Sequence, residues 1–293
     1  MEEIILKTPA KINWTLDVVR KRSDGYHDIS TIMQSIAIYD EIKIRSLSEK
    51  KIVVEVSDPN IPDGEDNIAY KAAKLMLDSF KIDRGLDIHI SKQIPSAAGL
   101  GGGSSDGAAV MFGIKYMYDI DVDLDTLISM GSVIGADIPF CILGGTALAE
   151  GIGEKLTPLS SIDKFWLIIV KPNINISTGE IYGRIQVDNI VNRPDNNRFI
   201  QALYSGDLEG MAKYGSNVLE EVSAGLYPII YDIKSDIRKA GAVYTLMSGS
   251  GPSVFGVFKT RDEAKKAYCL LKYKYEHIFL THTISKGPTI QEV

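Results

Sequence analysis

A glycine-rich segment in the middle of the chain constrains the fold more than any other feature of the sequence. It runs from Ile94 to Gly107, and five of the nine residues from 99 to 107 are glycine. Glycine adopts positive φ angles without steric cost and lets backbone N–H groups approach a ligand closely. An alternating stretch, residues 86–90, precedes the segment and the apolar run 108–112 follows it. We therefore expect a strand, a tight loop and a helix in that order.

This loop and the helix after it predict a phosphate-binding site. The first N–H groups of a helix have no partner within the helix, and the helix dipole places partial positive charge there. Ser104 and Ser105 stand where this helix is expected to begin and add two hydroxyl groups. A turn that binds no ligand would also connect strand and helix. It would not require three consecutive glycines beside two hydroxyls.

The spacing of the loop separates it from other glycine-rich motifs. A P-loop carries lysine directly before its Ser or Thr, where this chain has Gly103, and a Rossmann loop carries glycine where this chain has Ser104. Residues 103–107 also satisfy G-x-S-x-G, the nucleophile pattern of α/β-hydrolases. Such an enzyme needs a later histidine, and only His277 and His282 follow the loop. A hydrolase stays open as an alternative.

Two further segments carry charged or polar groups that suit phosphoryl transfer. Lys11 and Asn13 are two residues apart in a strand-like stretch and so share a face, and Asp137 interrupts an apolar stretch at a helix end. A carboxylate there is costly without a cationic partner or a task. An aspartate accepts or orients the proton of an attacking hydroxyl, and a neighbouring lysine keeps it ionised. Alone, the lysine would be solvated and the aspartate a helix cap.

Length and charge bound the class of protein. At ~150 residues per domain, 293 residues indicate about two domains. A net charge of −6 argues against a nucleic-acid partner. Asp137 and Pro139 interrupt the longest apolar stretch, residues 133–149, and the N-terminus lacks a signal-peptide pattern. We expect a soluble, cytoplasmic protein without membrane contact, with Cys141 and Cys269 reduced.

Hydrophobic patterns predict mixed strands and helices without a repeated parallel β-α-β period, which favours the α+β class. Strands are expected at residues 42–44, 52–56, 86–90, 166–170, 253–258 and 278–284. Helices are expected at residues 68–80, 124–134, 208–214, 229–239 and 262–272, with a loop at 188–197.

Three motifs in this order resemble those of the GHMP kinase superfamily. They are Pro-Ala-Lys-Ile-Asn at 9–13, Pro-Ser-Ala-Ala-Gly-Leu-Gly-Gly-Gly-Ser-Ser-Asp at 95–106, and Ser-Gly-Ser-Gly-Pro-Ser-Val-Phe-Gly at 248–256. Residues 21–27 (KRSDGYH) and 135–139 (GADIP) are similar to the branch that acts on 4-diphosphocytidyl-2-C-methyl-D-erythritol. The resemblance covers nearly the whole chain. Other small-alcohol kinases of the superfamily, and a nucleotide-binding protein without catalysis, remain alternatives.

The resemblance implies a two-domain GHMP kinase fold, with a ribosomal-S5-like N-terminal domain over residues 1–160 and a ferredoxin-like C-terminal domain over residues 161–293. It implies transfer of the ATP γ-phosphate to the 2-hydroxyl of 4-diphosphocytidyl-2-C-methyl-D-erythritol, a step of non-mevalonate isoprenoid precursor synthesis. ATP and Mg²⁺ are expected, with no protein ligand of Mg²⁺ assigned. The partners are the two small-molecule substrates, and we expect a monomer or weak homodimer.

The resemblance also implies roles for individual residues. Lys11 and Asp137 match the catalytic pair. Contacts to the substrate are implied for Asn13, Tyr26 and His27, and Tyr182 is the candidate that completes the stack on cytosine. Contacts to ATP are implied for Pro95, Ser96, Ala97, Ala98, Gly99, Leu100, Gly101, Gly102, Gly103, Ser104 and Ser105, and for Asn67 and Lys92.

Overall fold

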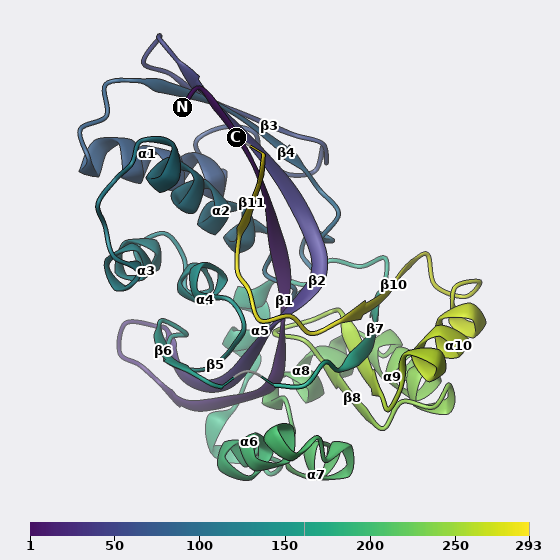
Figure 1. Ribbon diagram of the computed structural model, residues 1–293. Helices are drawn as coiled ribbons and strands as arrows, with labels where there is room; N and C mark the ends of the chain where they lie inside the picture. The colour runs from purple at the N-terminus through teal and green to yellow at the C-terminus, as the bar shows by residue number, and fades with distance from the viewer. Residues whose placement is uncertain (161, 293) are drawn as a thin grey trace.

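The chain folds around two β-sheets, as a computed structural model that describes residues 1–160 and 162–292 shows (Figure 1). The larger sheet has the strand order β11-β1-β2-β4-β3, and β5 pairs with β2 and with β6. Its strands are β1 (Glu3–Lys21), β2 (His27–Leu47), β3 (Ile52–Val56), β4 (Gly85–Ser91), β5 (Thr146–Gly151), β6 (Lys155–Pro158) and β11 (Thr289–Glu292). Its helices are α1 (Ile68–Ser79), α2 (Gly102–Met117), α3 (Leu124–Ser132) and α4 (Ile138–Leu143).

The second sheet is antiparallel, with the order β10-β7-β9-β8. Its strands are β7 (Trp166–Lys171), β8 (Tyr244–Met247), β9 (Val254–Phe258) and β10 (His277–His282). Its part of the chain also forms α5 (Thr178–Arg184), a 3₁₀ turn (Val187–Asn189), α6 (Asn196–Ser205), α7 (Leu208–Tyr214), α8 (Val218–Leu226), α9 (Ile229–Lys239) and α10 (Arg261–Leu271). The mixed architecture confirms the α+β prediction.

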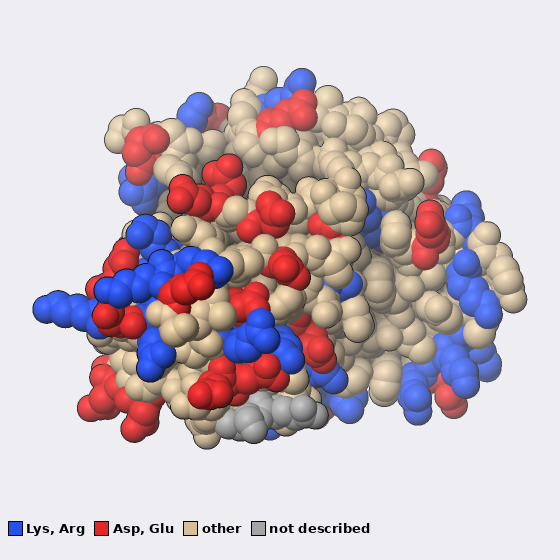
Figure 2. Space-filling model, turned by 90° about the horizontal axis from the view of Figure 1, so that it is seen from above, with Lys and Arg blue, Asp and Glu red and all other residues tan. Residues whose placement is uncertain are grey.

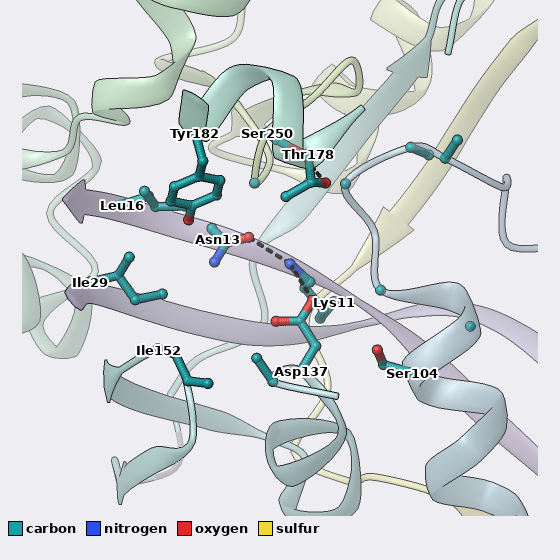
Figure 3. Close-up of a pocket in the computed structure, with 18 of the residues that line it drawn as sticks. Lys11, Asn13, Leu16, Ile29, Ser104, Asp137, Ile152, Thr178, Tyr182 and Ser250 are labelled. Carbon is teal, nitrogen blue, oxygen red and sulfur yellow. Dashed lines mark hydrogen bonds and ion pairs between the residues drawn. The ribbon is translucent and has the colours of Figure 1, made fainter. Parts of the chain in front are cut away.

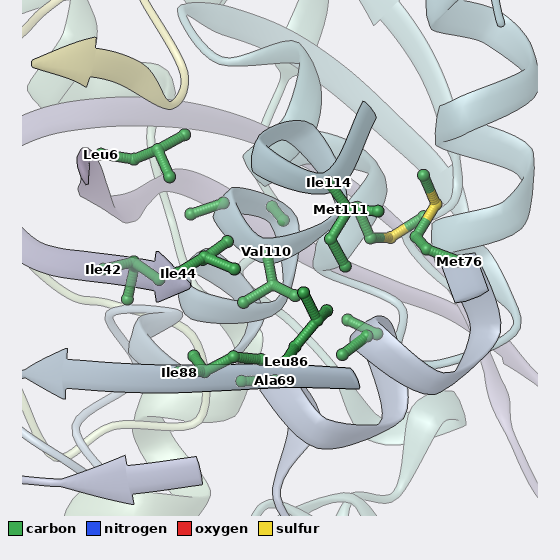
Figure 4. Close-up of a cluster of buried hydrophobic side chains, with 14 of the residues drawn as sticks. Leu6, Ile42, Ile44, Ala69, Met76, Leu86, Ile88, Val110, Met111 and Ile114 are labelled. Atoms are coloured by element: carbon green, nitrogen blue, oxygen red, sulfur yellow. The ribbon is translucent and has the colours of Figure 1, made fainter. Parts of the chain in front are cut away.

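The main core of the first unit lies between the sheet and helices α1 and α2 (Figure 4). Helix α2 rests directly on the strands at Gly113, where an added Cβ would lie 2.7 Å from Ile44 and 2.9 Å from Leu6. This close packing holds α2 against β1 and β2, and therefore also holds the glycine-rich loop that leads into α2.

β1 and β2 form one long hairpin that the sequence patterns revealed only in part. Residues 8–16 are all buried, so both faces of the strand are covered and apolar and polar residues do not alternate. Register shifts at Pro9/Ala10, Asn13/Thr15 and Val18/Arg20 bend the strand. The hairpin can therefore pair with β4 at one end and with β5 at the other.

β1 also joins the two sheets. Trp14 is fully buried and packs against Phe165, Tyr244 and Phe255 of the second unit, with ring centroids 5.5–6.4 Å apart. At the end of the chain, β11 returns to pair with β1. β11 covers residues 5–7 of β1, while residues 8–16 pair with β2 and also donate backbone hydrogen bonds outside the sheet, from the Lys11 N–H to Leu100 O and from the Leu16 N–H to Ser216 O, so this strand is fixed beside the site.

Most of the regular elements expected from sequence are present within a few residues of their expected bounds. The loop prediction for 188–197 is wrong at its end, because Asp195 caps α6 by accepting a hydrogen bond from the Arg198 N–H. The sequence patterns missed four strands and four helices, most of them short: β5, β6, β8 and β11, and α4, α5, α6 and α8. No helix in the described ranges is long and apolar enough to cross a membrane.

Candidate active site

A cleft of about 1010 Å³ lies where β1, the glycine-rich loop, α4 and α5 meet (Figure 3). We call residues 95–105 the phosphate loop. The cleft also takes lining residues from the start of β2 and from residues 249–250 between β8 and β9. Segments from both units therefore enclose it.

The phosphate loop has backbone geometry that few residues other than glycine adopt. Ala97, Gly99 and Gly101 have φ angles of 47°, 73° and 70°. Gly101 is also the N-cap of α2, so the helix begins at Gly102, earlier than the serines suggested. Gly102, Gly103 and Ser104 form its first turn and line the cleft. Their N–H groups have no intrahelical partner and are available to an anion.

Lys11 and Asp137 come together across the cleft from distant parts of the chain. The Lys11 ammonium lies 3.2 Å from Asp137 Oδ2 and donates a 2.8 Å hydrogen bond to Asn13 Oδ1 (Figure 3). Asn13 Nδ2 in turn donates to the Thr31 hydroxyl at 2.8 Å. The lysine stem runs over Gly101, where an added Cβ would lie 2.8 Å from Lys11 Cγ. The pair is therefore placed directly beside the phosphate loop.

Asp137 occupies the N-cap position of α4 but does not cap it. Its side chain makes no capping hydrogen bond and keeps 37% of its surface exposed, whereas the Lys11 side chain is only 6% exposed. The carboxylate is therefore open to the cleft while its cationic partner is fixed. Helix capping does not account for this residue.

The opposite end of the cleft is aromatic, and we call Tyr26, His27 and Tyr182 its aromatic end. The rings of His27 and Tyr182 lie 5.4 Å apart, and Tyr26 is 63% exposed at the tip of the β1–β2 hairpin. Burial, with a smaller contribution from Lys21, lowers the pKa of His27, so its imidazole is neutral at pH 7. A flat heteroaromatic ring is the kind of group that such faces bind.

The other expected residues divide into those that line the cleft and those that support it. The lining group is Pro95, Ser96, Ala97, Ala98, Gly99, Gly101, Gly102, Gly103, Ser104 and Lys92. Leu100 is buried in the apolar cluster beneath the loop, and Asn67 caps α1 through the Ala69 N–H. Ser105 is fully buried, with its hydroxyl 2.6 Å from Pro9 O and 2.7 Å from the Thr8 hydroxyl.

Lys92 lies in a buried charge cluster beneath the start of α2. Its ammonium group is 2.6 Å from Asp106 Oδ2 and also contacts Asp40, which accepts the backbone N–H groups of Gln93 and Ile94. Asp106 Oδ1 has no hydrogen-bond partner among the described residues. Burial raises the pKa of Asp106 well above its ordinary value. The nearby Asp40 raises it further, while Lys92 acts in the opposite direction. The cluster holds Lys92 in place.

The hydrolase alternative does not fit this arrangement. Ser105, the central serine of the G-x-S-x-G pattern, is fully buried and hydrogen-bonded to β1. His277 and His282 lie on β10 in the second sheet, and neither lines the cleft. The nucleophile therefore has no neighbouring base, which this chemistry requires.

Sequence reasoning missed several residues that line the cleft. Thr178 stands at the start of α5, and its hydroxyl lies 2.9 Å from that of Ser250. Ser250 belongs to the Ser-Gly-Ser-Gly-Pro-Ser-Val-Phe-Gly motif at residues 248–256, which gave a signal for it, whereas Thr178 lies outside the motifs described above. Apolar lining comes from Leu16 on β1, Ile29 on β2 and Ile152 in the turn after β5, and no local pattern could have assigned these.

Within residues 1–160 and 162–292, no group of three or more His, Cys, Asp or Glu side chains is placed to hold a metal ion. Mg²⁺ is commonly held by one or two carboxylates together with substrate phosphates and water, not by a complete protein cage. The side chains present therefore fit an Mg²⁺ ion whose ligands are mainly phosphate oxygens and water.

The sequence matches the family model "GHMP kinases N terminal domain" over residues 67–145 and "GHMP kinases C terminal" over residues 199–277. The protein named 4-diphosphocytidyl-2-C-methyl-D-erythritol kinase from Alkaliphilus oremlandii (strain OhILAs) is 46% identical over 291 residues, covering 99% of this chain and 100% of the relative. The protein of the same name from Acetivibrio thermocellus is 46% identical over 284 residues, covering 97% of this chain and 100% of the relative.

A solved structure agrees with these relatives. The crystal structure of a 4-(cytidine 5'-diphospho)-2C-methyl-D-erythritol kinase has a TM-score of 0.82 and 30% identity, covering 97% of this chain and 100% of that chain. Both units of the fold are included in this match. The chain therefore belongs to the GHMP kinases and, within them, to the family of 4-diphosphocytidyl-2-C-methyl-D-erythritol kinases.

Proposed function

We propose that this protein transfers the γ-phosphate of ATP to the 2-hydroxyl of 4-diphosphocytidyl-2-C-methyl-D-erythritol, giving the 2-phosphate and ADP in non-mevalonate isoprenoid precursor synthesis. The observation that carries the proposal is the 3.2 Å Lys11–Asp137 pair beside the phosphate loop in a cleft of about 1010 Å³. Family membership at 46% identity supports the substrate. The aromatic end of the cleft supplies faces for its cytosine.

The phosphate loop binds the triphosphate in this proposal. The first N–H groups of α2, at Gly102, Gly103 and Ser104, supply donors and the positive end of the helix dipole. Because N–H groups bind phosphate without an excess of Lys and Arg side chains, a net charge of −6 is compatible with a polyphosphate ligand. Asn67 and Ser105 do not line the cleft and support the loop from beneath through their hydrogen bonds, whereas Lys92 lines the cleft while its ammonium group is held by Asp106.

Asp137 and Lys11 act at the reacting atoms. Asp137 accepts the proton of the 2-hydroxyl as its oxygen attacks the γ-phosphorus, and the bond from that phosphorus to the β–γ bridging oxygen breaks. Lys11 orients the Asp137 carboxylate through their 3.2 Å ion pair and stabilises negative charge on the transferring group. Asn13 orients the ammonium group through its 2.8 Å hydrogen bond. Positioning and electrostatics supply most of the catalysis.

At the aromatic end, we assign the cytosine to the faces of Tyr26 and Tyr182, with His27 beside them. Stacking on an aromatic face contributes ~1–3 kcal/mol per base. The neutral imidazole of His27 offers both a donor and an acceptor to the edge of the base.

The same proposal includes Mg²⁺, bound through ATP phosphate oxygens and water. When bound, the ion neutralises phosphate charge and polarises the transferring group. We also propose a cytoplasmic monomer or weak homodimer, with ATP and one small substrate as partners and no nucleic acid or membrane. Two free cysteines and an ATP substrate agree with that location. We place the domain boundary near residue 160, just before β7 begins the second sheet, with β11 returning to the first.

A substrate panel with purified protein and Mg-ATP tests the proposal. We expect ADP and phosphorylated product with 4-diphosphocytidyl-2-C-methyl-D-erythritol, and little with mevalonate, homoserine or galactose. Preference for one of the last three would overturn the substrate. ATP binding without any product would instead indicate a nucleotide-binding protein without catalysis.

A further inference from the structure

On one side, the turn between β8 and β9 (residues 248–251) is hydrogen-bonded to helix α8 and its N-cap residue Asn217. Asn217 Nδ2 donates 2.8 Å hydrogen bonds to Met247 O and Gly249 O, and the Ser223 hydroxyl donates to Ser250 O at 3.0 Å. We call residues 248–251 the serine turn. Its backbone is therefore fixed before any ligand binds.

From its other side, the serine turn holds the phosphate loop. The Ser248 hydroxyl donates to Gly99 O at 2.9 Å and accepts the Asn13 backbone N–H at 3.3 Å. An added Cβ at Gly99 would lie 2.2 Å from Ser248 O, so the two segments are in direct contact. The turn thus touches the loop and strand β1 through one hydroxyl.

The next serine in the turn reaches in a different direction. The Ser250 hydroxyl lies 2.9 Å from that of Thr178, the first residue of α5 (Figure 3). Ser250 is 7% exposed, and both residues line the cleft. Tyr182 lies four residues after Thr178, on the same face of the helix. A helix of seven residues has little stability of its own, so its tertiary contacts fix its place.

We propose that Ser250 is a positioning residue that fixes helix α5, and with it Tyr182, relative to the phosphate loop. The proposal rests on the proposed function, because it assigns Tyr182 to the cytidine end of the substrate. Ser250 acts through Thr178 and Tyr182. Without its hydroxyl, α5 keeps its packing but loses the contact that aligns Tyr182 with a base whose phosphates are bound elsewhere.

The test compares Ser250→Ala, Thr178→Val and the double variant with the unmodified protein in steady-state kinetics. We expect Ser250→Ala to raise the KM for the diphosphocytidyl substrate roughly threefold to tenfold, the effect of one lost hydrogen bond, with smaller changes in kcat and in the KM for ATP. The double variant should be no worse than the more affected single variant, because both lose the same bond. Ser250→Thr, which keeps a hydroxyl, should restore the KM.

Ser177→Ala is the matched control. Ser177 caps the same helix through the Glu180 N–H but does not touch Ser250, so its loss weakens α5 without removing the proposed contact. A KM increase in Ser177→Ala equal to that in Ser250→Ala would overturn the proposal, since weakening of the helix would then explain both. Additive effects of Ser250→Ala and Thr178→Val, or equal increases in both KM values, would also overturn it.

Calorimetric titration with cytidine 5'-diphosphate separates this inference from the proposed function, because it requires no turnover. We expect Ser250→Ala to weaken binding by the same threefold to tenfold factor. If the unmodified protein binds the diphosphate and Ser250→Ala weakens it, the positioning role stands even where the kinase assay fails. If binding is absent, or is unchanged by Ser250→Ala, the positioning role is wrong.

Discussion

The Lys11 ammonium lies 3.2 Å from Asp137 Oδ2, with the lysine 6% exposed and the aspartate 37% exposed. The pair is asymmetric. The Lys11 ammonium group is buried and held by its hydrogen bond to Asn13, whereas the Asp137 carboxylate faces the cleft. A fixed cation beside a reachable carboxylate orients that carboxylate without hiding it from a hydroxyl. This geometry supports the proposed role of Asp137 as general base.

Asp137→Asn should lower kcat by roughly 10²–10⁴-fold, the usual contribution of a positioned acid or base. The amide keeps the shape of the side chain, so binding of a non-hydrolysable ATP analogue should change little. Kinetics and calorimetry on the same preparation check both expectations. Asp123→Asn makes the same change of charge at an exposed cap of α3, outside the cleft, and should leave kcat unchanged. Full turnover in Asp137→Asn would show that Asp137 is not the base.

Gly101→Ala should damage the site more than its backbone alone explains. A residue with a Cβ is strained at a φ of 70°, at a cost of about 1–2 kcal/mol, and this Cβ would also lie 2.8 Å from Lys11 Cγ. Gly206 is the matched control, because it has a φ of 67° and nothing within 4 Å of an added Cβ. We expect similar thermal destabilisation in both variants but loss of kcat only in Gly101→Ala. Equal kcat values would exclude displacement of Lys11.

The sequence predicted the chemistry of the site better than its walls. Three features are visible in the sequence because each departs from what is ordinary at its position. The phosphate loop has more glycines than a simple turn needs, Lys11 lies in a strand-like stretch beside Asn13, and Asp137 places a charge in an apolar stretch. Ile29 and Ile152 break none, since an isoleucine in a strand or in the turn after it is ordinary, and only the pairing of β2 with β5, which sets Ile29 opposite Gly151, places them in one cleft. Only a short strand-like stretch of the long β1 was visible in the sequence, because burial on both faces removes the alternation that identifies a strand.

Tyr182→Ala should raise the KM for the diphosphocytidyl substrate, because one stacking face is worth ~1–3 kcal/mol, or about 5- to 150-fold. Tyr182→Phe keeps the face and should remain within a few-fold of the unmodified protein. The KM for ATP should not change in either variant. Tyr273→Ala, at an 86% exposed position outside the cleft, is the control. An unchanged substrate KM in Tyr182→Ala would remove this residue from the cytosine site.

Asp40 and Asp106 share Lys92 but should respond differently to loss of charge. Asp40 accepts two backbone N–H groups as well as the ammonium group, whereas Asp106 has one oxygen without a partner among the described residues and a pKa raised by burial. Asp106→Asn imitates a protonated acid and should cost less than about 1 kcal/mol of unfolding free energy near pH 5. Asp40→Asn removes a carboxylate that contacts Lys92 and also accepts the Gln93 and Ile94 N–H groups, and it should cost about 3–5 kcal/mol.

The pH dependence follows from the same pair. Because the folded-state pKa of Asp106 lies above its unfolded value, its stabilising contribution is complete below about pH 4 and is lost as the pH rises through the raised value. Asp106→Asn cannot ionise, so its unfolding free energy relative to the unmodified protein should increase between pH 5 and pH 8. Urea unfolding at both values measures this. If the difference stays constant, or if Asp106→Asn costs as much as Asp40→Asn, then Asp106 is ionised in the folded protein and Lys92 neutralises both carboxylates equally.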